Sequence, residues 1–484
     1  VLNVLARINY PSGQYTVNLS GPYTLTNDDV TVLNTASTYI QDKDIVIQGT
    51  GTFVAGGNAQ GGDTNSYRFA RVYPNFRSLT WKNIIFRQDF LNNSDSWYIN
   101  ANGHSMTFED CTFIGPVIID AGGNSTAGTS GSTLTVKNCI NVNRIYANRT
   151  SNKTLGNTTI TVESCSGSGT AGVTIDPASA GYVQKLTVNV TDTKATVTPT
   201  IQGSTYTIKK DYVLNVKDSN IAFTNPVVSS YSYTATTNLS GDIVLRDTCR
   251  GRTNSSSGKG KAILNVNGTV KTQEDKDVYL ANFDTINVSG ELRLGNYTNS
   301  KDSGFSGTYV KPDVTLSGSG KLILESLASG TNYRTIKSLK STGTNTEISF
   351  SYIYDGTPSS LAGRPLIVEN ALTVPSGGKL RVSTALMPKH TGTDVYPLLQ
   401  FNFANGNDGD ANAKLDQYTW IADQRYYLQK GGRYNNQIVL CADTYAPLVY
   451  QNYTSSLKLQ ENGDQTGTIA KLNCNNGYTS VPVC

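Results

Sequence analysis

The sequence is poor in the residues on which most enzymes and nucleic-acid-binding proteins depend. It has two histidines, two methionines and three tryptophans in 484 residues, and only 16% of the chain is charged. Because 40 Lys and Arg stand against 36 Asp and Glu, the net charge of +4 creates no concentrated basic field, and no nucleic-acid partner is expected. No apolar run approaches the roughly 18 residues of a membrane helix, so membrane insertion is not expected either.

Small and uncharged polar residues are abundant instead. The chain contains 45 Gly, 46 Asn and 103 Ser and Thr, whereas strong helix formers are scarce. Such a composition excludes a mostly helical protein and favours an all-β fold. Uncharged polar side chains on a β surface are typical of proteins that work outside the cell, so we predict an extracellular protein, either secreted or attached to the cell surface.

A repeat of 26 to 28 residues organises the first half of the chain. In each copy apolar residues alternate over a short strand, as in Leu134 and Val136, which indicates one buried face. A turn-forming residue such as Asn138 follows the strand and predicts a corner. Stacked repeats of strand and corner predict a right-handed parallel β-helix. The aligned residues just after each corner are Ile84, Cys111, Cys139, Cys165, Thr191 and Ser219.

The second half keeps short alternating strands but has glycine at the corners. Gly268, Gly290, Gly320 and Gly378 stand at these positions, where a tight turn with positive φ is expected. We predict an N-terminal cap with the first strands over residues 1–40, a β-helix of roughly 13 coils over 41–383, and a β-rich C-terminal cap over 384–484. The cap is predicted from short antiparallel strands within Pro397–Phe401, Tyr418–Ile421, Tyr426–Leu428 and Gln437–Leu440, because an open solenoid edge needs a cover.

The seven cysteines form two groups. Cys111, Cys139 and Cys165 occupy equivalent positions in successive repeats, so we expect an inward ladder of buried free thiols about 4.8 Å apart, too far for disulfides without strain. Cys474 and Cys484 bracket a short tail and predict a terminal disulfide in an oxidising compartment. Cys249 and Cys441 then remain as a second candidate pair, although spacing alone does not fix the connectivity.

Arginines and aromatic residues are concentrated in one segment, which we predict as a ligand-binding patch. Aromatic rings stack on sugars and arginines pair with sugar carboxylates. The same alternation also suits one more strand with its rings buried. The candidate ligand-binding residues are Tyr67, Arg68, Phe69, Arg71, Tyr73, Phe76 and Arg77, extended downstream by Trp97 and Tyr98.

Three stretches resemble the pectate lyase-like adhesive domain of Gram-positive bacterial cell-surface proteins. They are Ile45–Thr52, Leu79–Phe86 and Ala101–Asp110, within a region of similarity over roughly residues 1 to 200. The resemblance implies a parallel β-helix used for adhesion, without enzymatic activity, and it supplies no catalytic residue.

No ordered set of catalytic residues supports an enzyme. His104 and the acidic residues around Asp110 lack the spacing of a polygalacturonase or of a calcium-dependent lyase. No cofactor or bound metal is expected, with calcium as the one ion left open. The leading hypothesis is a non-enzymatic adhesin whose partner is a polysaccharide, a glycoprotein or a matrix protein. The alternatives are a structural subunit that self-associates into an extracellular fibre, and a polysaccharide lyase or depolymerase.

Overall fold

A computed structural model describes the chain in segments, each containing one or a few β-strands. Over these segments the secondary structure is all β, with no helix, and therefore no helix long and apolar enough to cross a membrane. The described residues are 12–24, 43–55, 77–88, 97–101, 103–122, 131–147, 155–177, 183–199, 207–252, 260–295, 303–306, 310–325, 335–350, 353–354, 365–373, 380–384, 387–388, 395–401, 415–419, 426–431 and 434–442.

The chain divides into two compact units. Unit 1 comprises Val1–Gly268 with Ala281–Asp284, and unit 2 comprises Thr269–Leu280 with Thr285–Cys484. Each is described by itself below. The predicted boundaries near residues 40 and 383 concern a different division, into caps and coils, and stay predictions.

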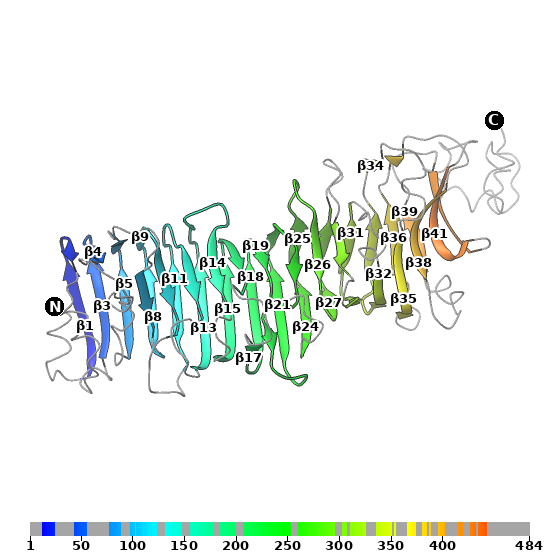
Figure 1. Cartoon of the computed structure of the whole chain (residues 1–484). Helices are drawn as coiled ribbons and strands as arrows, with labels where there is room; N and C mark the ends of the chain where they lie inside the picture. The colour runs from blue at the N-terminus through cyan, green and yellow to red at the C-terminus, as the bar shows by residue number, and fades with distance from the viewer. Residues whose placement is uncertain are drawn as a thin grey trace, which may run out of the picture. The chain divides into compact units, whose positions relative to one another are not determined.

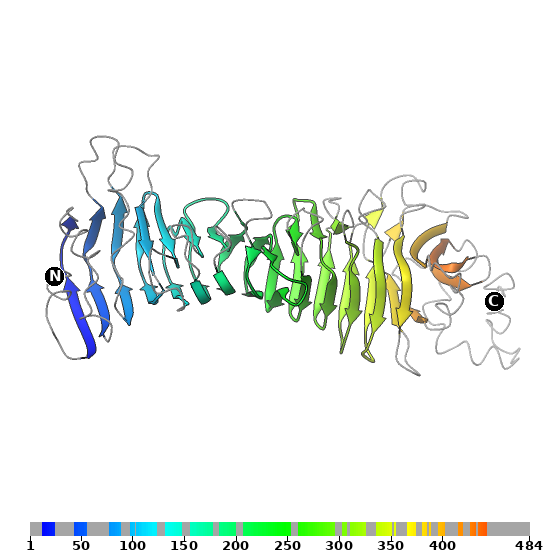
Figure 2. The same ribbon diagram turned by 60° about the horizontal axis from the view of Figure 1, so that its bottom comes forward.

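Unit 1 is built around a long parallel sheet that takes one strand from each turn. Successive strands lie side by side in both views, coloured blue to green (Figure 1 and Figure 2). Their parallel pairings make this unit a β-solenoid. The strands are β1 (Gly13–Leu19), β3 (Lys43–Gly49), β5 (Ser78–Lys82), β8 (Ser105–Glu109), β11 (Thr133–Lys137), β13 (Leu155–Glu163), β15 (Val183–Thr191), β18 (Tyr212–Lys217), β21 (Thr234–Ser240) and β24 (Lys261–Val266).

The register of this sheet follows the sequence repeat. Leu134 pairs with Met106 on one side and with Ile160 on the other, as the alignment predicts. Leu134 and Val136 are fully buried, whereas Thr133 and Thr135 between them face outward. The period-2 pattern thus separates an apolar interior from a polar outer face, and the predicted all-β parallel solenoid is confirmed.

A second parallel sheet and several short ones complete the turns of unit 1. After β5 and β8 a short strand separates the long strand from the second-sheet strand, whereas from β11 onward the second-sheet strand is the next strand. The second sheet contains β7 (Trp97–Asn100), β10 (Val117–Asp120), β12 (Arg144–Tyr146), β14 (Val173–Asp176), β16 (Lys194–Val197), β19 (Asn220–Phe223) and β22 (Asp242–Leu245). The short strands are β2 (Tyr23–Thr24), β4 (Thr52–Ala55), β6 (Ile85–Gln88), β9 (Thr112–Ile114), β17 (Thr207–Ile208), β20 (Val227–Val228) and β23 (Cys249–Arg250).

Unit 2 also contains two parallel stacks. One holds β27 (Thr285–Val288), β30 (Asp313–Leu316), β32 (Thr335–Ser341), β35 (Leu366–Thr373) and β38 (Val395–Phe401), and the other holds β25 (Thr269–Thr272), β28 (Glu291–Leu294), β31 (Lys321–Leu324), β33 (Glu347–Phe350), β36 (Leu380–Thr384) and β39 (Leu415–Thr419). The remaining strands are β26 (Val278–Ala281), which ends at the unit boundary, β29 (Ser303–Ser306), β34 (Ile353–Tyr354), β37 (Met387–Pro388), β40 (Tyr426–Gly431) and β41 (Tyr434–Ala442).

The C-terminal strands are antiparallel only in part. β41 pairs antiparallel with both β38 and β40, in line with the prediction for these segments. For Tyr418 and Thr419, the described part of the predicted strand Tyr418–Ile421, the prediction is wrong, because β39 pairs parallel with β36 and continues the solenoid pattern. An alternating segment of five residues does not reveal the direction of its partner, so the sequence pattern alone did not distinguish the two arrangements.

The corners of unit 1 correct one part of the predicted alignment. Ser164, Asp192 and Asp218 have positive φ, so the residues just after them, Cys165, Thr193 and Ser219, are equivalent. Hydrogen bonds from Cys165 N to Thr193 Oγ1 and from Thr193 N to Ser219 Oγ link the three. The predicted equivalent, Thr191, is two residues too early. A shift by two keeps the same residues on the buried face, so alternation did not reveal the error.

The predicted positive φ at the glycine corners is wrong for the described residues. Gly268, Gly290 and Gly320 lack positive φ, and Gly378 lies outside the described residues. Gly241 and Gly318 have positive φ instead. A Cβ atom at Gly268 would overlap the backbone of Gly241 in the preceding turn. Glycine is therefore needed at Gly268 for close backbone approach between turns and not for a left-handed conformation.

Candidate functional site

Most of the predicted ligand-binding patch lies outside the described residues. This holds for Tyr67, Arg68, Phe69, Arg71, Tyr73 and Phe76, and equally for Cys474 and Cys484 of the predicted disulfide. Trp97 and Tyr98 lie on β7, where they pair with Val117 and Ile118, but their side chains are outside the description. The structure therefore does not bring this set together as a site, and the patch stays a prediction.

Arg77 is the member of the patch whose side chain is described, and it is engaged with a neighbouring turn. Its guanidinium forms an ion pair with Asp44, with Nε donating to Asp44 Oδ1 at 2.9 Å. Ser78 Oγ donates to the same carboxylate at 2.6 Å. These hydrogen bonds, that of Arg77 foremost, lower the pKa of Asp44 to about 2. Arg77 thus acts as a connector between β3 and β5.

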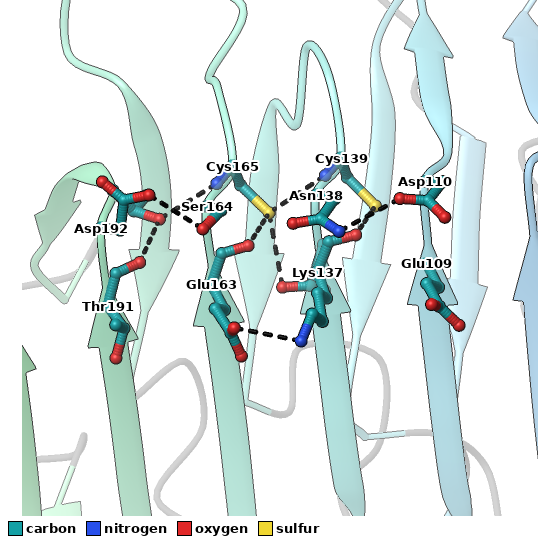
Figure 3. Close-up of polar contacts among 12 residues, drawn as sticks. Glu109, Asp110, Lys137, Asn138, Cys139, Glu163, Ser164, Cys165, Thr191 and Asp192 are labelled. Atoms are coloured by element: carbon teal, nitrogen blue, oxygen red, sulfur yellow. Dashed lines mark hydrogen bonds and ion pairs between the residues drawn. The ribbon is translucent and has the colours of Figure 1, made fainter.

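The three cysteines of the predicted ladder lie in one interior column, each with a buried, free thiol. Their sulfurs contact backbone: Cys139 N donates to Cys165 Sγ at 3.4 Å, and Cys139 Sγ lies 3.2 Å from Lys137 O (Figure 3). Interaction with Cys111 and burial raise the pKa of Cys139 to about 12, and interaction with Cys139 and burial likewise raise the pKa of Cys165. Cys139 and Cys165 therefore pack as small apolar groups and are poor nucleophiles.

Cys249 is a buried, free thiol, which does not support the predicted pair with Cys441. Its Sγ lies 3.3 Å from Asp247 O, and burial raises its pKa to about 12. Cys441 is on β41, and its side chain is outside the description.

His104 occupies a turn before β8, with its backbone N bonded to Ala101 O at 3.0 Å. Across the described segments, no three His, Cys, Asp or Glu side chains gather as a metal-binding group. The outer faces of the sheets in these segments carry regular arrays of polar side chains.

The outer face of the long sheet in unit 1 carries a regular array of hydroxyl groups. On four successive strands, β5, β8, β11 and β13, the same two outward positions hold Ser or Thr. Ser78 of β5 donates to Asp44, so the array without carboxylate contacts begins at β8. The register places Thr135 directly between Thr107 and Thr161. We call this array the hydroxyl grid; it consists of Ser105, Thr107, Thr133, Thr135, Thr159 and Thr161.

The spacing of the hydroxyl grid is fixed by the fold. Along a strand, outward residues two apart are about 6.6 Å apart, and neighbouring strands are about 4.8 Å apart. All six side chains are half-buried or exposed. Thr161 Oγ1 accepts a hydrogen bond from Asn189 Nδ2 at 3.2 Å, while the other five hydroxyls have no protein partner. These five are available to a ligand or to water.

An asparagine ladder continues the grid on the later strands. Asn215 Nδ2 donates to Asn189 Oδ1 at 2.8 Å, Asn238 Nδ2 to Asn215 Oδ1 at 2.8 Å, and Asn265 Nδ2 to Asn238 Oδ1 at 2.7 Å. These amides are used mainly to connect turns. The outward surface therefore changes from available hydroxyls to mutually bonded amides along the sheet.

The charged side chains on the strands of the hydroxyl grid form two ion pairs with neighbouring turns. Lys82 Nζ lies 3.2 Å from Glu109 Oε1, and Lys137 Nζ lies 3.1 Å from Glu163 Oε1, the second pair being drawn in Figure 3. At the adjoining corner, Asn138 Nδ2 donates to Asp110 Oδ1 at 3.2 Å and Ser164 Oγ to Asp192 Oδ2 at 2.9 Å. A face with paired charges and uncharged hydroxyls favours a neutral partner over an ionic one.

Comparison with known proteins identifies no relative. No family model, no curated protein and no solved structure matches the chain.

Proposed function

We propose that this protein is an extracellular, non-enzymatic adhesin that binds a polysaccharide along the hydroxyl grid. The observation that carries the proposal is the in-register array on β8, β11 and β13, with five hydroxyls that have no protein partner. A polysaccharide is the partner of matching chemistry, because it presents hydroxyl groups at repeated intervals and carries both donors and acceptors.

The physical basis is many weak contacts in place of one strong pocket. A neutral hydrogen bond contributes a net of about 0.5–1.5 kcal/mol, so a single hydroxyl gives little affinity. Contacts repeated on successive turns add once the first is made, because the ligand is then held close to the next position. The parallel pairing of the strands keeps these positions aligned before the ligand arrives, which reduces the ordering cost of binding.

Composition and resemblance support the same proposal. The outer surface is rich in Ser, Thr and Asn, which suits an extracellular location. The resemblance of residues 1 to 200 to pectate lyase-like adhesive domains of Gram-positive bacteria points to adhesion in preference to catalysis. The paired charges of Lys82, Glu109, Lys137 and Glu163 favour a neutral glycan as the ligand of this face.

The test is binding of the full chain to an array of neutral polysaccharides, with and without Ca²⁺. Replacing Thr107 and Thr135 together by Val removes two hydroxyls at nearly constant volume, and we expect binding to weaken about tenfold or more. Thr269→Val, on an exposed position of β25 in unit 2, is the matched control and should bind as the unmodified chain does.

Two other outcomes would replace the proposal. Unsaturated sugar products accumulating on incubation with acidic polysaccharides would identify a lyase. Ordered filaments by negative-stain microscopy, together with no binding to any glycan, would identify a fibre subunit.

A further inference from the structure

Two arginines of unit 1, Arg144 and Arg246, differ from others in the described segments because they have no carboxylate partner. Arg77 pairs with Asp44, and Arg252 pairs with Asp284. Arg144 instead donates from Nη1 to Tyr146 Oη at 2.9 Å, with its guanidinium 5.8 Å from the centre of the Tyr146 ring. An arginine without a counter-ion on a protein surface is available to an external anion.

The two arginines occupy the same outward column of the second sheet. Arg144 pairs with Thr174, Thr174 with Thr196, and Thr196 with Ala222. Ile221 pairs with Leu245, so the next residues along the two strands, Ala222 and Arg246, lie side by side. The backbone N of Arg246 donates to Ile221 O at 2.9 Å, in agreement with this register. We call this column the arginine lane; it consists of Arg144, Thr174, Thr196, Ala222 and Arg246.

The guanidinium of Arg246 extends back along the arginine lane. Its Nη2 donates to Ala171 O at 2.9 Å, to the carbonyl of Ala195 and to Thr196 Oγ1 at 3.0 Å. The group therefore lies near β14 and β16, two turns before its own strand. Its Nε is buried without a protein partner. Burial lowers the pKa of Arg246, the direction expected for a cation that loses water without gaining a counter-ion.

The surroundings favour an extended anion. With Arg246 drawn back to β16, its charge lies about two strand spacings, or roughly 10 Å, from β12, which carries Arg144. The hydroxyl of Thr174, which lies between Arg144 and the guanidinium of Arg246, has no protein partner. Ala222 has a small side chain that does not obstruct a ligand along the lane. Lys194, exposed on β16, adds positive charge, while Asp247 is the exposed acidic neighbour of Arg246. The predicted ligand-binding residue Tyr98 holds the same register position, two strands before Arg144.

We propose that the arginine lane is a second binding site, which takes a linear acidic polysaccharide with anionic groups recurring about 10 Å apart. Arg144 and Arg246 would each bind one anionic group, and the Thr174 hydroxyl would contact the sugar between them. The anionic group is a carboxylate or a sulfate. The arginine lane lies on the second sheet, whereas the hydroxyl grid lies on the long sheet. The proposed ligand of the lane is charged, and the proposed ligand of the grid is neutral.

The test measures binding of the full chain to hyaluronate, which carries a carboxylate on alternate sugars, to dextran sulfate and to uncharged dextran. We expect Arg144→Gln and Arg246→Gln each to weaken binding of an acidic polymer about tenfold. Lys340→Gln removes one positive charge from an exposed position of β32 in unit 2 and should leave binding unchanged. If the Arg246→Gln variant folds poorly, Arg246→Lys replaces it, because lysine keeps the charge but lacks the guanidinium. Thr174→Val tests the contribution of the hydroxyl in the lane without altering any charge.

The outcomes separate this site from the hydroxyl grid. If the Arg144→Gln and Arg246→Gln variants lose hyaluronate binding but keep dextran sulfate binding, the ligand of the lane is a carboxylate. If they lose dextran sulfate binding but keep hyaluronate binding, the ligand is a sulfate. Equal weakening by Lys340→Gln and Arg144→Gln would overturn the lane, because binding would then depend only on net charge. Unchanged binding in both the Arg144→Gln and the Arg246→Gln variants would overturn it as well. The variants of Thr107 and Thr135 should retain acidic-polymer binding, so failure of one site does not imply failure of the other.

Discussion

The corner after each long strand determines, at the scale of single residues, how the turns of unit 1 stack. Asn83, Asp110 and Asn138 adopt φ of 56°, 54° and 52°, a region in which Asn and Asp are several-fold enriched. The next residue turns into the interior, where the column holds a thiol, as in Cys139, or a hydroxyl, as in Thr193. One local conformation therefore fixes both the turn and the interior column.

Glycine at Gly268 is required by the backbone of the neighbouring turn. We expect Gly268→Ala to lower the free energy of unfolding by about 1–3 kcal/mol, because the added Cβ displaces Gly241. Gly169→Ala is the matched control, since nothing lies within 4 Å of a Cβ there and its φ is not positive. Urea unfolding of the two variants measures the difference. Equal stability of both variants would show that the two turns are not in close contact.

The connection between Asp44 and Arg77 predicts a pH dependence. The pKa of Asp44 falls from 3.8 to about 2 on folding, so its stabilisation is fully present above about pH 4 and is lost as the pH falls toward 2. The pair is partly exposed, which limits its contribution to about 1 kcal/mol or less. We expect Asp44→Asn to reduce stability at pH 6 and to reduce it much less at pH 2, as measured by urea unfolding. A reduction of the same size at both pH values would contradict this account.

At the scale of elements, aromatic side chains hold the early turns together. Phe86 on β6 stacks on Phe113 of β9, with centroids 5.3 Å apart and 11° between the rings. Trp81 and Phe108, on β5 and β8, meet Phe86 edge-on at 5.2 and 5.6 Å. All four rings are almost completely buried. This cluster packs the long sheet against the short sheet of β4, β6 and β9.

Removing one ring of this cluster should be costly. We expect Phe108→Ala to reduce the free energy of unfolding by about 3–5 kcal/mol, through lost burial and the cavity left behind. Tyr231→Ala is the control, since Tyr231 is 79% exposed, and it should change stability by less than about 0.5 kcal/mol. Denaturant unfolding measures both. A small effect of Phe108→Ala would mean that the interior is less tightly packed than the structure indicates.

Sequence reasoning predicted the elements of unit 1 better than its binding surfaces. Alternation around Leu134 and Val136 is a strong signal because burial on one face repeats every second residue. The arginine lane gave no such signal, since Arg144, Thr174 and Arg246 fall at unequal intervals that depend on the length of each turn. Likewise the two-residue error at Thr191 arose because a shift by two preserves the alternation, and the register and the φ of Asp192 show the correct alignment.

At the scale of the whole molecule, the two outer faces of unit 1 suit different ligands. The long sheet presents uncharged hydroxyls beside two ion pairs, and the second sheet presents two arginines without carboxylate partners. A solenoid separates such faces because each sheet has its own outward columns, built from different positions of every turn. Adhesion to a mixed extracellular matrix would benefit from this separation.

The most direct test of the central claim is the affinity of the full chain for neutral oligosaccharides of increasing length, measured by isothermal titration calorimetry. If the hydroxyl grid binds the ligand across β8, β11 and β13, affinity should rise with each added sugar until the ligand spans the three strands and then level off. The variant with Thr107 and Thr135 replaced by Val should lose that rise. Full affinity for a mono- or disaccharide, unchanged in the variant, would contradict the account, since it would place binding in a single pocket elsewhere.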